Sequence, residues 1–173
     1  MSTLTRNIPN VAAGASVPSL AGALFATEPS LSQTLLRVTL GGVLLPHGAQ
    51  HLFGLFGGYG FDGTVGWMTG TLGIPAPLAA AGILLEFFGP LLLLAGVASR
   101  LVGAALAVFM AVAGSTHVAN GFFMNWFGTL PAGVEGFEYH LLTVALAVAI
   151  AVNGGGALSI DRLLAARLEG RRQ

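Results

Sequence analysis

The sequence predicts an all-α integral membrane protein whose fold is a bundle of four transmembrane helices. Its composition supports this prediction, because 54% of the 173 residues are hydrophobic, only 8% are charged, and the mean hydropathy is +0.81. Soluble domains carry roughly 25% charged residues, so this chain has too few charges to cover an aqueous surface. We therefore expect a lipid bilayer as its surroundings.

The few charged residues exclude several classes of function. Seven arginines balance seven acidic residues, and the chain contains no lysine. The basic surface that a nucleic acid requires is missing, so we expect no DNA or RNA partner. The chain also has no cysteine, which excludes disulfides, cysteine-ligated iron–sulfur clusters and thioether-attached haem.

Long stretches without charge place the four spans, because a helix that crosses the hydrocarbon core needs about 20 apolar residues. They define one membrane domain, residues 31–160. Residues 1–30 are expected to form a cytoplasmic tail, disordered or lying on the membrane surface, and residues 161–173 a basic cytoplasmic tail. The expected spans cover residues 31–53, 77–97, 101–122 and 138–153.

The arginines set the expected orientation, since positively charged loops stay on the cytoplasmic side. Arg37 lies in the first turns of the first span, Arg100 lies between the second and third, and four arginines follow the fourth. Both termini are therefore expected inside, with the loops 54–76 and 123–137 outside. A weak signal peptide within residues 1–30 is the alternative, but its cleavage would leave these arginines on the outer side.

Ionisable residues lie on the inward faces of the predicted helices. Glu86 falls within a stripe of small residues in the second span, and an acid at that depth is costly unless it is protonated or paired. His117 and the pair His47 and His51 follow the helical spacing of small residues in their own spans. A rise of about 1.5 Å per residue places all of them in the outer half of the bundle. We expect one polar pocket there.

The fourth span offers two further candidates for this pocket, Glu138 and His140. They lie about 160° apart on a helix with roughly 100° per residue. Only one of them can face the centre of the bundle, and both stay candidates at this stage.

Several histidines with a glutamate suit a quinone or quinol pocket. Such a pocket needs an apolar slot, a hydrogen-bond donor at each carbonyl, and an acid or base that moves protons. Glu86 and His117 are the expected catalytic pair in this proton relay. The other carbonyl is expected to meet cofactor-binding groups from the remaining set, His47, His51, Glu138 and His140.

Other uses of the same residues stay open. A b-type haem could bind between histidines on facing helices of the bundle. The spacing of His47 and His51 also suits two imidazoles on one transition metal, provided that His117 or Glu86 completes the ligand set. The polar cluster could also serve only to hold the helices together, as in an accessory or scaffold subunit. Transport is disfavoured, because no inverted repeat is obvious.

Five segments of the chain carry a family pattern. They read LLRVTLGGVLLPHGAQHLFGLFGGYG, LLEFFGPLLLLAGVASR, HVANGFF, GFEYHLL and GGGALSIDRLL, and they extend over about residues 33–164. In this order and spacing the chain resembles the DoxX family of small four-span bacterial membrane proteins. The positions that correspond to the family pattern are Arg37, His47, Gly48, Glu86, His117, Asn120–Phe123, Glu138 and Asp161.

Two positions depart from that pattern. The family motif commonly reads His-Gly-x-x-Lys, and this chain has His51 in place of the lysine. An asparagine often follows the family's Glu-Tyr pair, and this chain has His140 there. The two extra histidines favour the haem and metal alternatives, and a role of the family lysine does not carry over.

The resemblance implies a multi-pass redox protein or redox subunit of the bacterial plasma membrane. The family takes its name from membrane subunits associated with terminal quinol oxidase and thiosulfate:quinone oxidoreductase, which implies quinone chemistry without naming a substrate. Because the chain has no electron carrier of its own, we expect an electron-donor or acceptor protein to dock on the outer loops. A homo-oligomer also stays open.

Overall fold

The computed structural model describes residues 20–131 and 134–170, and that part of the chain is helical. It contains seven α-helices, two short 3-10 helices and no strand. The prediction of an all-α fold is confirmed. Residues 1–19 of the predicted tail 1–30 lie outside the described residues.

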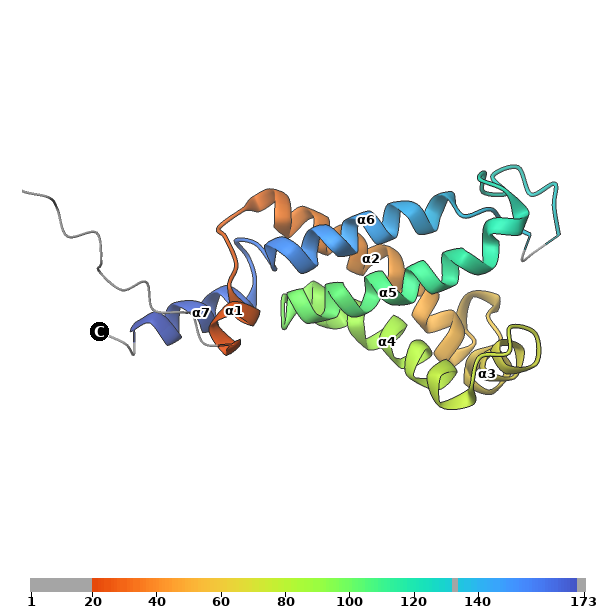
Figure 1. Ribbon diagram of the computed structural model, residues 1–173, viewed down its shortest axis with the longest axis horizontal. Helices are drawn as coiled ribbons and strands as arrows, with labels where there is room; N and C mark the ends of the chain where they lie inside the picture. Colours follow the sequence, from red (N-terminus) through yellow and green to blue (C-terminus); the bar gives the residue numbers. More distant parts are fainter. Residues whose placement is uncertain (1–19, 132–133, 171–173) are drawn as a thin grey trace, which may run out of the picture.

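Four long helices form the body of the molecule (Figure 1). Helix α2 packs along α4, α5 packs along α6, and α2 also touches α6. The first and fourth helices match their predicted ranges at both ends, whereas the second and third begin and end earlier than predicted. The bounds are α2 Leu31–Phe53, α4 Ala76–Ala95, α5 Ser99–His117 and α6 Glu138–Asn153.

The local sequence sets where these helices begin and end. The hydroxyl of Ser30 accepts a hydrogen bond from the backbone N–H of Gln33 at 3.2 Å, which caps the first turn of α2. Helix α2 ends at Gly54, whose φ of 72° is a left-handed conformation that glycine adopts without strain. Helix α4 begins after Pro75 and ends in the same way at Gly96, whose φ is 70°.

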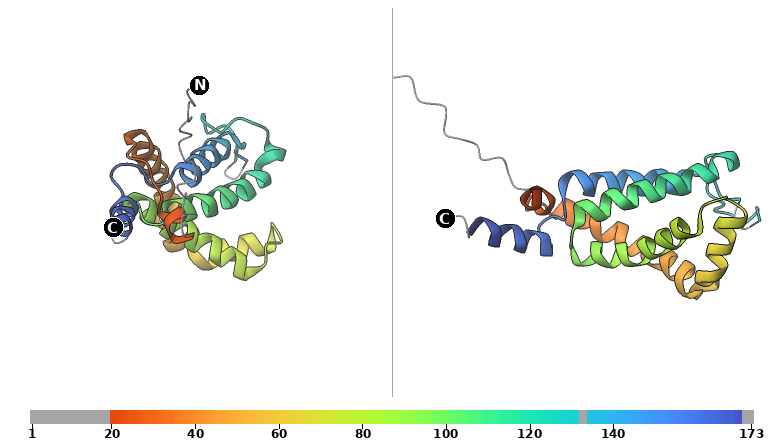
Figure 2. Two further views of the ribbon diagram at one scale, coloured as in Figure 1. Left: turned by 60° about the vertical axis from the view of Figure 1, so that its left-hand side comes forward. Right: turned by 60° about the horizontal axis from the view of Figure 1, so that its bottom comes forward.

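Three short helices lie where the sequence predicted tails or a loop. Helices α1 (Leu20–Phe25) and α7 (Ile160–Gly170) fall in the predicted tails and pack against each other, and α3 (Gly60–Gly70) falls in the predicted loop 54–76. The prediction rested on long uncharged stretches, which short helices do not need. Helices α1 and α7 lie at one end of the bundle, the α7 end, and α3 lies at the other, the α3 end (Figure 2).

Two of the described helices are long and apolar enough to cross a membrane, judged by length and composition. They are α4, and α5 extended by the 3-10 helix η2 (Val118–Asn120). Helix α6 is apolar but has only 16 residues. Helix α2 has the length, but Arg37 and two histidines interrupt its apolar residues.

Glycines let the long helices approach backbone to backbone. A Cβ added at Gly48 on α2 would overlap the backbone of Glu86 on α4, and one at Gly103 on α5 would lie 2.9 Å from the carbonyl of Ala147 on α6. Close contact of small residues is the ordinary way in which helices pack in lipid. The contact at Gly48 brings α2 and α4 together at the level of Glu86.

Arg37 is buried at the α7 end, with 1% of its surface exposed. Its guanidinium donates only to backbone carbonyls: Nε to Gly155 at 2.8 Å, and the terminal nitrogens to Leu158 at 2.5 Å and to Leu93 and Leu94 at the end of α4. A helix leaves its last carbonyls without partners in the helix, and a cation suits that end of the helix dipole. Arg37 therefore ties α2 to the end of α4 and to the α6–α7 connection.

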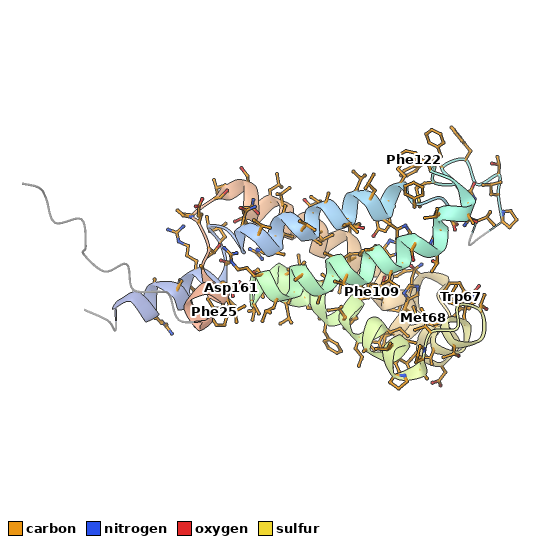
Figure 3. The ribbon with its side chains drawn as sticks, viewed as in Figure 1. Phe25, Trp67, Met68, Phe109, Phe122 and Asp161 are labelled. Atoms are coloured by element: carbon orange, nitrogen blue, oxygen red, sulfur yellow. The ribbon has the colours of Figure 1, made fainter. Side chains whose placement is uncertain are left out.

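Asp161, in the first turn of α7, is as buried as Arg37 (Figure 3). Its two carboxylate oxygens accept the backbone N–H groups of Ala98 at 2.7 Å and Ser99 at 2.8 Å, at the start of α5. A carboxylate from another helix thus caps α5, whose own cap residue, Ala98, has a φ of 49° and offers no side-chain hydrogen bond. Arg37 and Asp161 both act at this joint between helices.

Candidate functional site

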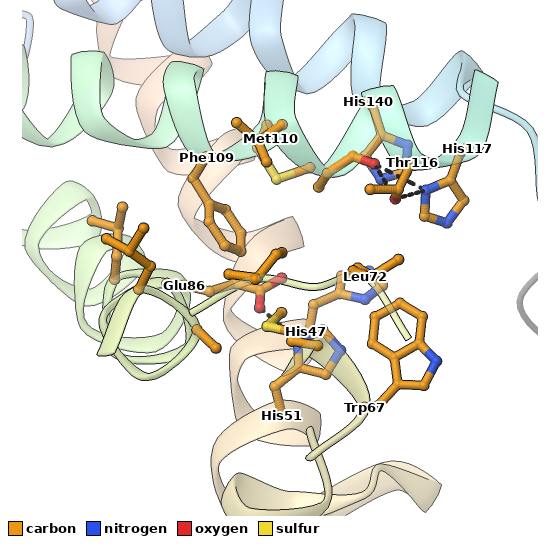
Figure 4. Close-up of a pocket in the computed structure, with 18 of the residues that line it drawn as sticks. His47, His51, Trp67, Leu72, Glu86, Phe109, Met110, Thr116, His117 and His140 are labelled. Carbon is orange, nitrogen blue, oxygen red and sulfur yellow. Dashed lines mark hydrogen bonds and ion pairs between the residues drawn. The ribbon is translucent and has the colours of Figure 1, made fainter. Parts of the chain in front are cut away.

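A cavity of about 960 Å³ lies toward the α3 end of the bundle. Helices α2, α4, α5 and α6 contribute to its wall, and Trp67, Met68 and Leu72 reach it from α3 and the residues that follow (Figure 4). Most of the wall is apolar. The predicted site residues on this wall are His47, His51, Glu86, His117 and His140.

Glu86 and His51 form a hydrogen-bonded pair across α4 and α2. Nδ1 of His51 lies 2.5 Å from Oε2 of Glu86. Glu86 is 5% exposed, whereas His51 is partly open to the cavity. The pairing follows from the helix crossing at Gly48, because His51 lies one turn further along α2. A buried carboxylate with a hydrogen-bonded imidazole can hold a proton on either partner, which suits proton exchange with a ligand.

Four aromatic rings continue the polar wall from α2 across α6 to α5. The ring centroids are 5.5 Å apart for His47 and Tyr139, 5.5 Å for Tyr139 and His140, and 4.6 Å for His140 and His117. We call this set the ring row. His140 and His117, at the α6 and α5 end of the row, lie across the cavity from the His51–Glu86 pair, whereas His47 lies on α2 one turn before His51 (Figure 4).

Two buried polar atoms of the ring row have no hydrogen-bond partner among the described residues. They are the hydroxyl of Tyr139 and Nδ1 of His140. A buried polar group without a partner costs free energy, so such atoms in a native structure ordinarily bond to a water molecule or a ligand. Both residues line the cavity. The two atoms themselves are buried just behind the cavity surface.

His117 stands at the end of the ring row nearest the end of α5. Its Nδ1 lies 3.0 Å from the carbonyl of Ala113 and 3.1 Å from the hydroxyl of Thr116. A carbonyl can only accept, so Nδ1 carries the hydrogen and donates it to Ala113. Nε2 is then the nitrogen of His117 that can accept a proton.

The structure separates Glu138 from the other predicted residues. Glu138 is not part of the cavity wall, and its Oε2 accepts hydrogen bonds from the backbone N–H of Met124 at 3.3 Å and the indole N–H of Trp126 at 3.2 Å. It holds the loop that follows η2. Of the two residues left open on the fourth helix, His140 is the one on the cavity wall.

The pairing within the site also differs from the sequence-based interpretation. The partner of Glu86 is His51, whereas His117 lies in the ring row. No group of three metal-ligating side chains that could hold a metal ion occurs among the described residues. The set proposed for a metal, His47, His51 and His117, is therefore not gathered as a ligand set there.

Sequence reasoning missed Tyr139 altogether. An aromatic residue at the start of a predicted span is ordinarily a membrane-interface anchor, and nothing in its spacing distinguishes it. Its position between two candidates, Glu138 and His140, was the one available signal. Trp67, an aromatic residue of the predicted outer loop 54–76, also lines the cavity.

Comparison with known families agrees with the resemblance seen in the sequence. A model of the DoxX family matches residues 32–119, just over half of the chain. The match begins in α2 and ends in η2, so it includes His47, His51, Glu86 and His117. No curated protein and no solved structure matches the chain.

Proposed function

The chain belongs to the DoxX family, and from this premise we propose that it binds a quinone or quinol in the cavity and exchanges protons with it. The protein is then a redox protein, or a redox subunit, of the bacterial plasma membrane. Its four long helices are the four spans. Its α3 end faces outward and both termini face the cytoplasm.

One observation carries the proposal: hydrogen-bonding groups face each other across an otherwise apolar cavity. The His51–Glu86 pair lies on one side and His140 and His117 lie on the other (Figure 4). A quinone is a flat apolar ring with two oxygen atoms on opposite edges. It needs a polar partner at each oxygen and apolar surface between them.

The residues divide the proton chemistry between the two sides. A bound quinone supplies a two-electron, two-proton redox couple. Glu86, hydrogen bonded to His51, exchanges one proton at its side of the cavity. His140 and the hydroxyl of Tyr139 hold the opposite oxygen, and His117 passes the second proton between the ring row and water at the α3 end. The electrons come from, or go to, a partner redox protein that docks at that end.

Exposed aromatic side chains at the α3 end support the placement of a docking or interface region there. Phe123 is 75% exposed, Trp126 is 73% exposed and Phe127 is 91% exposed. Tryptophan and other aromatic residues are favoured at the membrane–water interface and at protein interfaces.

Helix α6, at about 24 Å for 16 residues, is shorter than a typical hydrocarbon core and requires local thinning of the bilayer around it.

The observed contacts support the metal-binding and scaffold alternatives less well than they support a quinone site. The pairing of His51 with Glu86 removes the i, i+4 histidine pair as a ready set of metal ligands. A scaffold role would leave the buried atoms of Tyr139 and His140 unexplained. We therefore carry the quinone forward as the proposed ligand.

Quinone binding to matched carboxylate variants tests the proposal. Glu86→Gln keeps the shape of a side chain on the cavity wall, and Glu138→Gln makes the same change at a carboxylate outside the wall. We expect Glu86→Gln to weaken binding of a ubiquinone or menaquinone analogue by about ten- to a hundredfold, the effect of losing a charge-assisted hydrogen bond. Glu138→Gln should bind as the wild type does.

Equilibrium binding to the purified protein in lipid nanodiscs gives these affinities. Equal affinity of folded Glu86→Gln and wild-type protein would overturn the proposal. A wild-type protein that binds no quinone would do the same and would favour the scaffold role.

A further inference from the structure

The cavity reaches the outer surface of the bundle between α4 and α5. These helices meet at the turn of residues 96–98 and diverge toward the α3 end (Figure 1). Several residues of the cavity wall on these helices are exposed, among them Leu78 at 64%, Val108 at 67% and Val112 at 51%. Most of the surface of Leu78 and Val108 is exposed although both residues line the cavity, which indicates that the cavity opens there.

This opening forms an apolar groove. On α4 its sides are Leu78, Gly82 and Leu85, and on α5 they are Ala105, Val108 and Val112; we call it the α4–α5 groove. All six residues are apolar. The wall positions on α5 run from Ala105 to His117, a length of about 18 Å at 1.5 Å per residue.

Phe109 sets the width of the groove near its middle. A Cβ added at Gly82 would lie 2.8 Å from Cε2 of Phe109, so the phenyl ring rests directly on the backbone of α4. The ring leaves no room for a second helix to enter between α4 and α5. The cavity wall continues past the ring along α5, with Ala105 before Phe109 and Val112 after it.

We propose that the α4–α5 groove binds the hydrocarbon tail of the ligand while the ligand's polar ring occupies the cavity. This inference rests on the proposed function and narrows it to long-tailed, lipid-borne quinones. The groove and the cavity share one wall, so one molecule with a polar head and an apolar tail fills both. Because the opening faces sideways between two apolar helices, the ligand enters from the hydrocarbon core and not from water.

Two neighbouring alanines on α5 allow a matched test. Ala105 is exposed and lines the groove, whereas Ala104 is exposed and does not line it. Ala105→Trp fills the groove with an indole, and Ala104→Trp places the same group on the next residue of the same helix. The ligands are a quinone with a long isoprenoid tail and the same ring without a tail, each titrated into nanodisc-embedded protein.

We expect Ala105→Trp to weaken binding of the long-tailed quinone by about tenfold, which corresponds to the burial of about two methylene groups. Binding of the tail-less ring should change less than twofold, and Ala104→Trp should change neither. An equal loss of affinity for both ligands, or no loss for either, overturns the proposal that the α4–α5 groove binds the tail. Failure of both ligands to bind wild-type protein overturns the proposed function itself, and the two failures are therefore distinguishable.

Photolabelling of the wild-type protein is a second test, and it does not depend on whether Ala105→Trp folds. A long-tailed quinone that carries a diazirine at the end of its tail is bound, illuminated and located by peptide mass spectrometry. We expect the label on α4 and α5 within residues 78–85 and 105–112. Labelling spread over the lipid-facing surfaces of α2 and α6 contradicts the inference.

Discussion

The backbone of Gly48 on α2 lies directly against the backbone of Glu86 on α4, with no space for a Cβ between them. This contact fixes the distance between the two helices. One turn later on α2, His51 reaches the carboxylate of Glu86 at 2.5 Å. The polar pair of the cavity therefore depends on a glycine that itself has no functional group.

Gly48→Ala is predicted to lower stability. The added methyl group overlaps the carbonyl and Cα atoms of the facing helix, which cannot move aside as a side chain can. We expect a loss of about 1–3 kcal/mol and a lower melting temperature in detergent. The control is Gly42→Ala on the same helix, where a Cβ meets nothing within 4 Å. That variant should be neutral or slightly stabilised, and equal melting of the two variants would contradict the close contact.

Arg37→Lys is predicted to destabilise the α7 end. The guanidinium donates to four carbonyls in different directions, and a single ammonium group cannot reach them all. Carbonyls left unpartnered in a buried site cost about 1–3 kcal/mol each. Thermal unfolding of Arg37→Lys should therefore occur well below that of wild type. Arg167→Lys, at an exposed position on α7, should melt as the wild type does.

Asp161→Asn is predicted to loosen the start of α5. Both carboxylate oxygens accept backbone N–H groups, and the amide of asparagine offers only one acceptor oxygen. We expect a loss of about 0.5–2 kcal/mol, as for other helix caps. Hydrogen exchange at Ala98 and Ser99 should accelerate. Asp62→Asn at an exposed site in α3 is the control, and unchanged exchange in Asp161→Asn would argue against the cap.

Tyr139→Phe is predicted to separate binding from stability. The hydroxyl has no hydrogen-bond partner among the described residues, so its removal should leave the melting temperature unchanged or slightly raised. If the hydroxyl binds the ligand, quinone affinity should fall by about two- to tenfold, the effect of one hydrogen bond. Isothermal titration and a thermal melt of the same sample give both numbers. A large loss of stability with unchanged affinity would assign the hydroxyl to the fold.

The sequence predicted the helices that bear the site better than it predicted the contacts within the site. Uncharged stretches located α2 and α6 with their observed bounds. This worked because the length and the charge of a segment can be read from its own residues alone. The same reasoning missed α1, α3 and α7, whose 6–11 residues are too short to leave a long uncharged stretch.

Helical spacing also predicted which histidines share the cavity, since residues three or four positions apart lie on one face of a helix. It could not predict the partner of each group. The pairing of His51 with Glu86 depends on where two helices cross, and the carbonyls that accept from Arg37 belong to residues more than 50 positions away in the chain. Tyr139 was missed because only its neighbours in space show that its hydroxyl is buried beside the cavity.

The fluorescence of Trp67 offers the most direct test of the central claim that a quinone binds in the cavity. The chain has two tryptophans, of which Trp67 lines the cavity and Trp126 does not. Single-tryptophan variants, Trp126→Phe and Trp67→Phe, are titrated with a quinone, which quenches an indole that it contacts. We predict saturable quenching of Trp67 that Glu86→Gln weakens, and only weak, unsaturable quenching of Trp126. Equal and unsaturable quenching of both tryptophans would contradict the account.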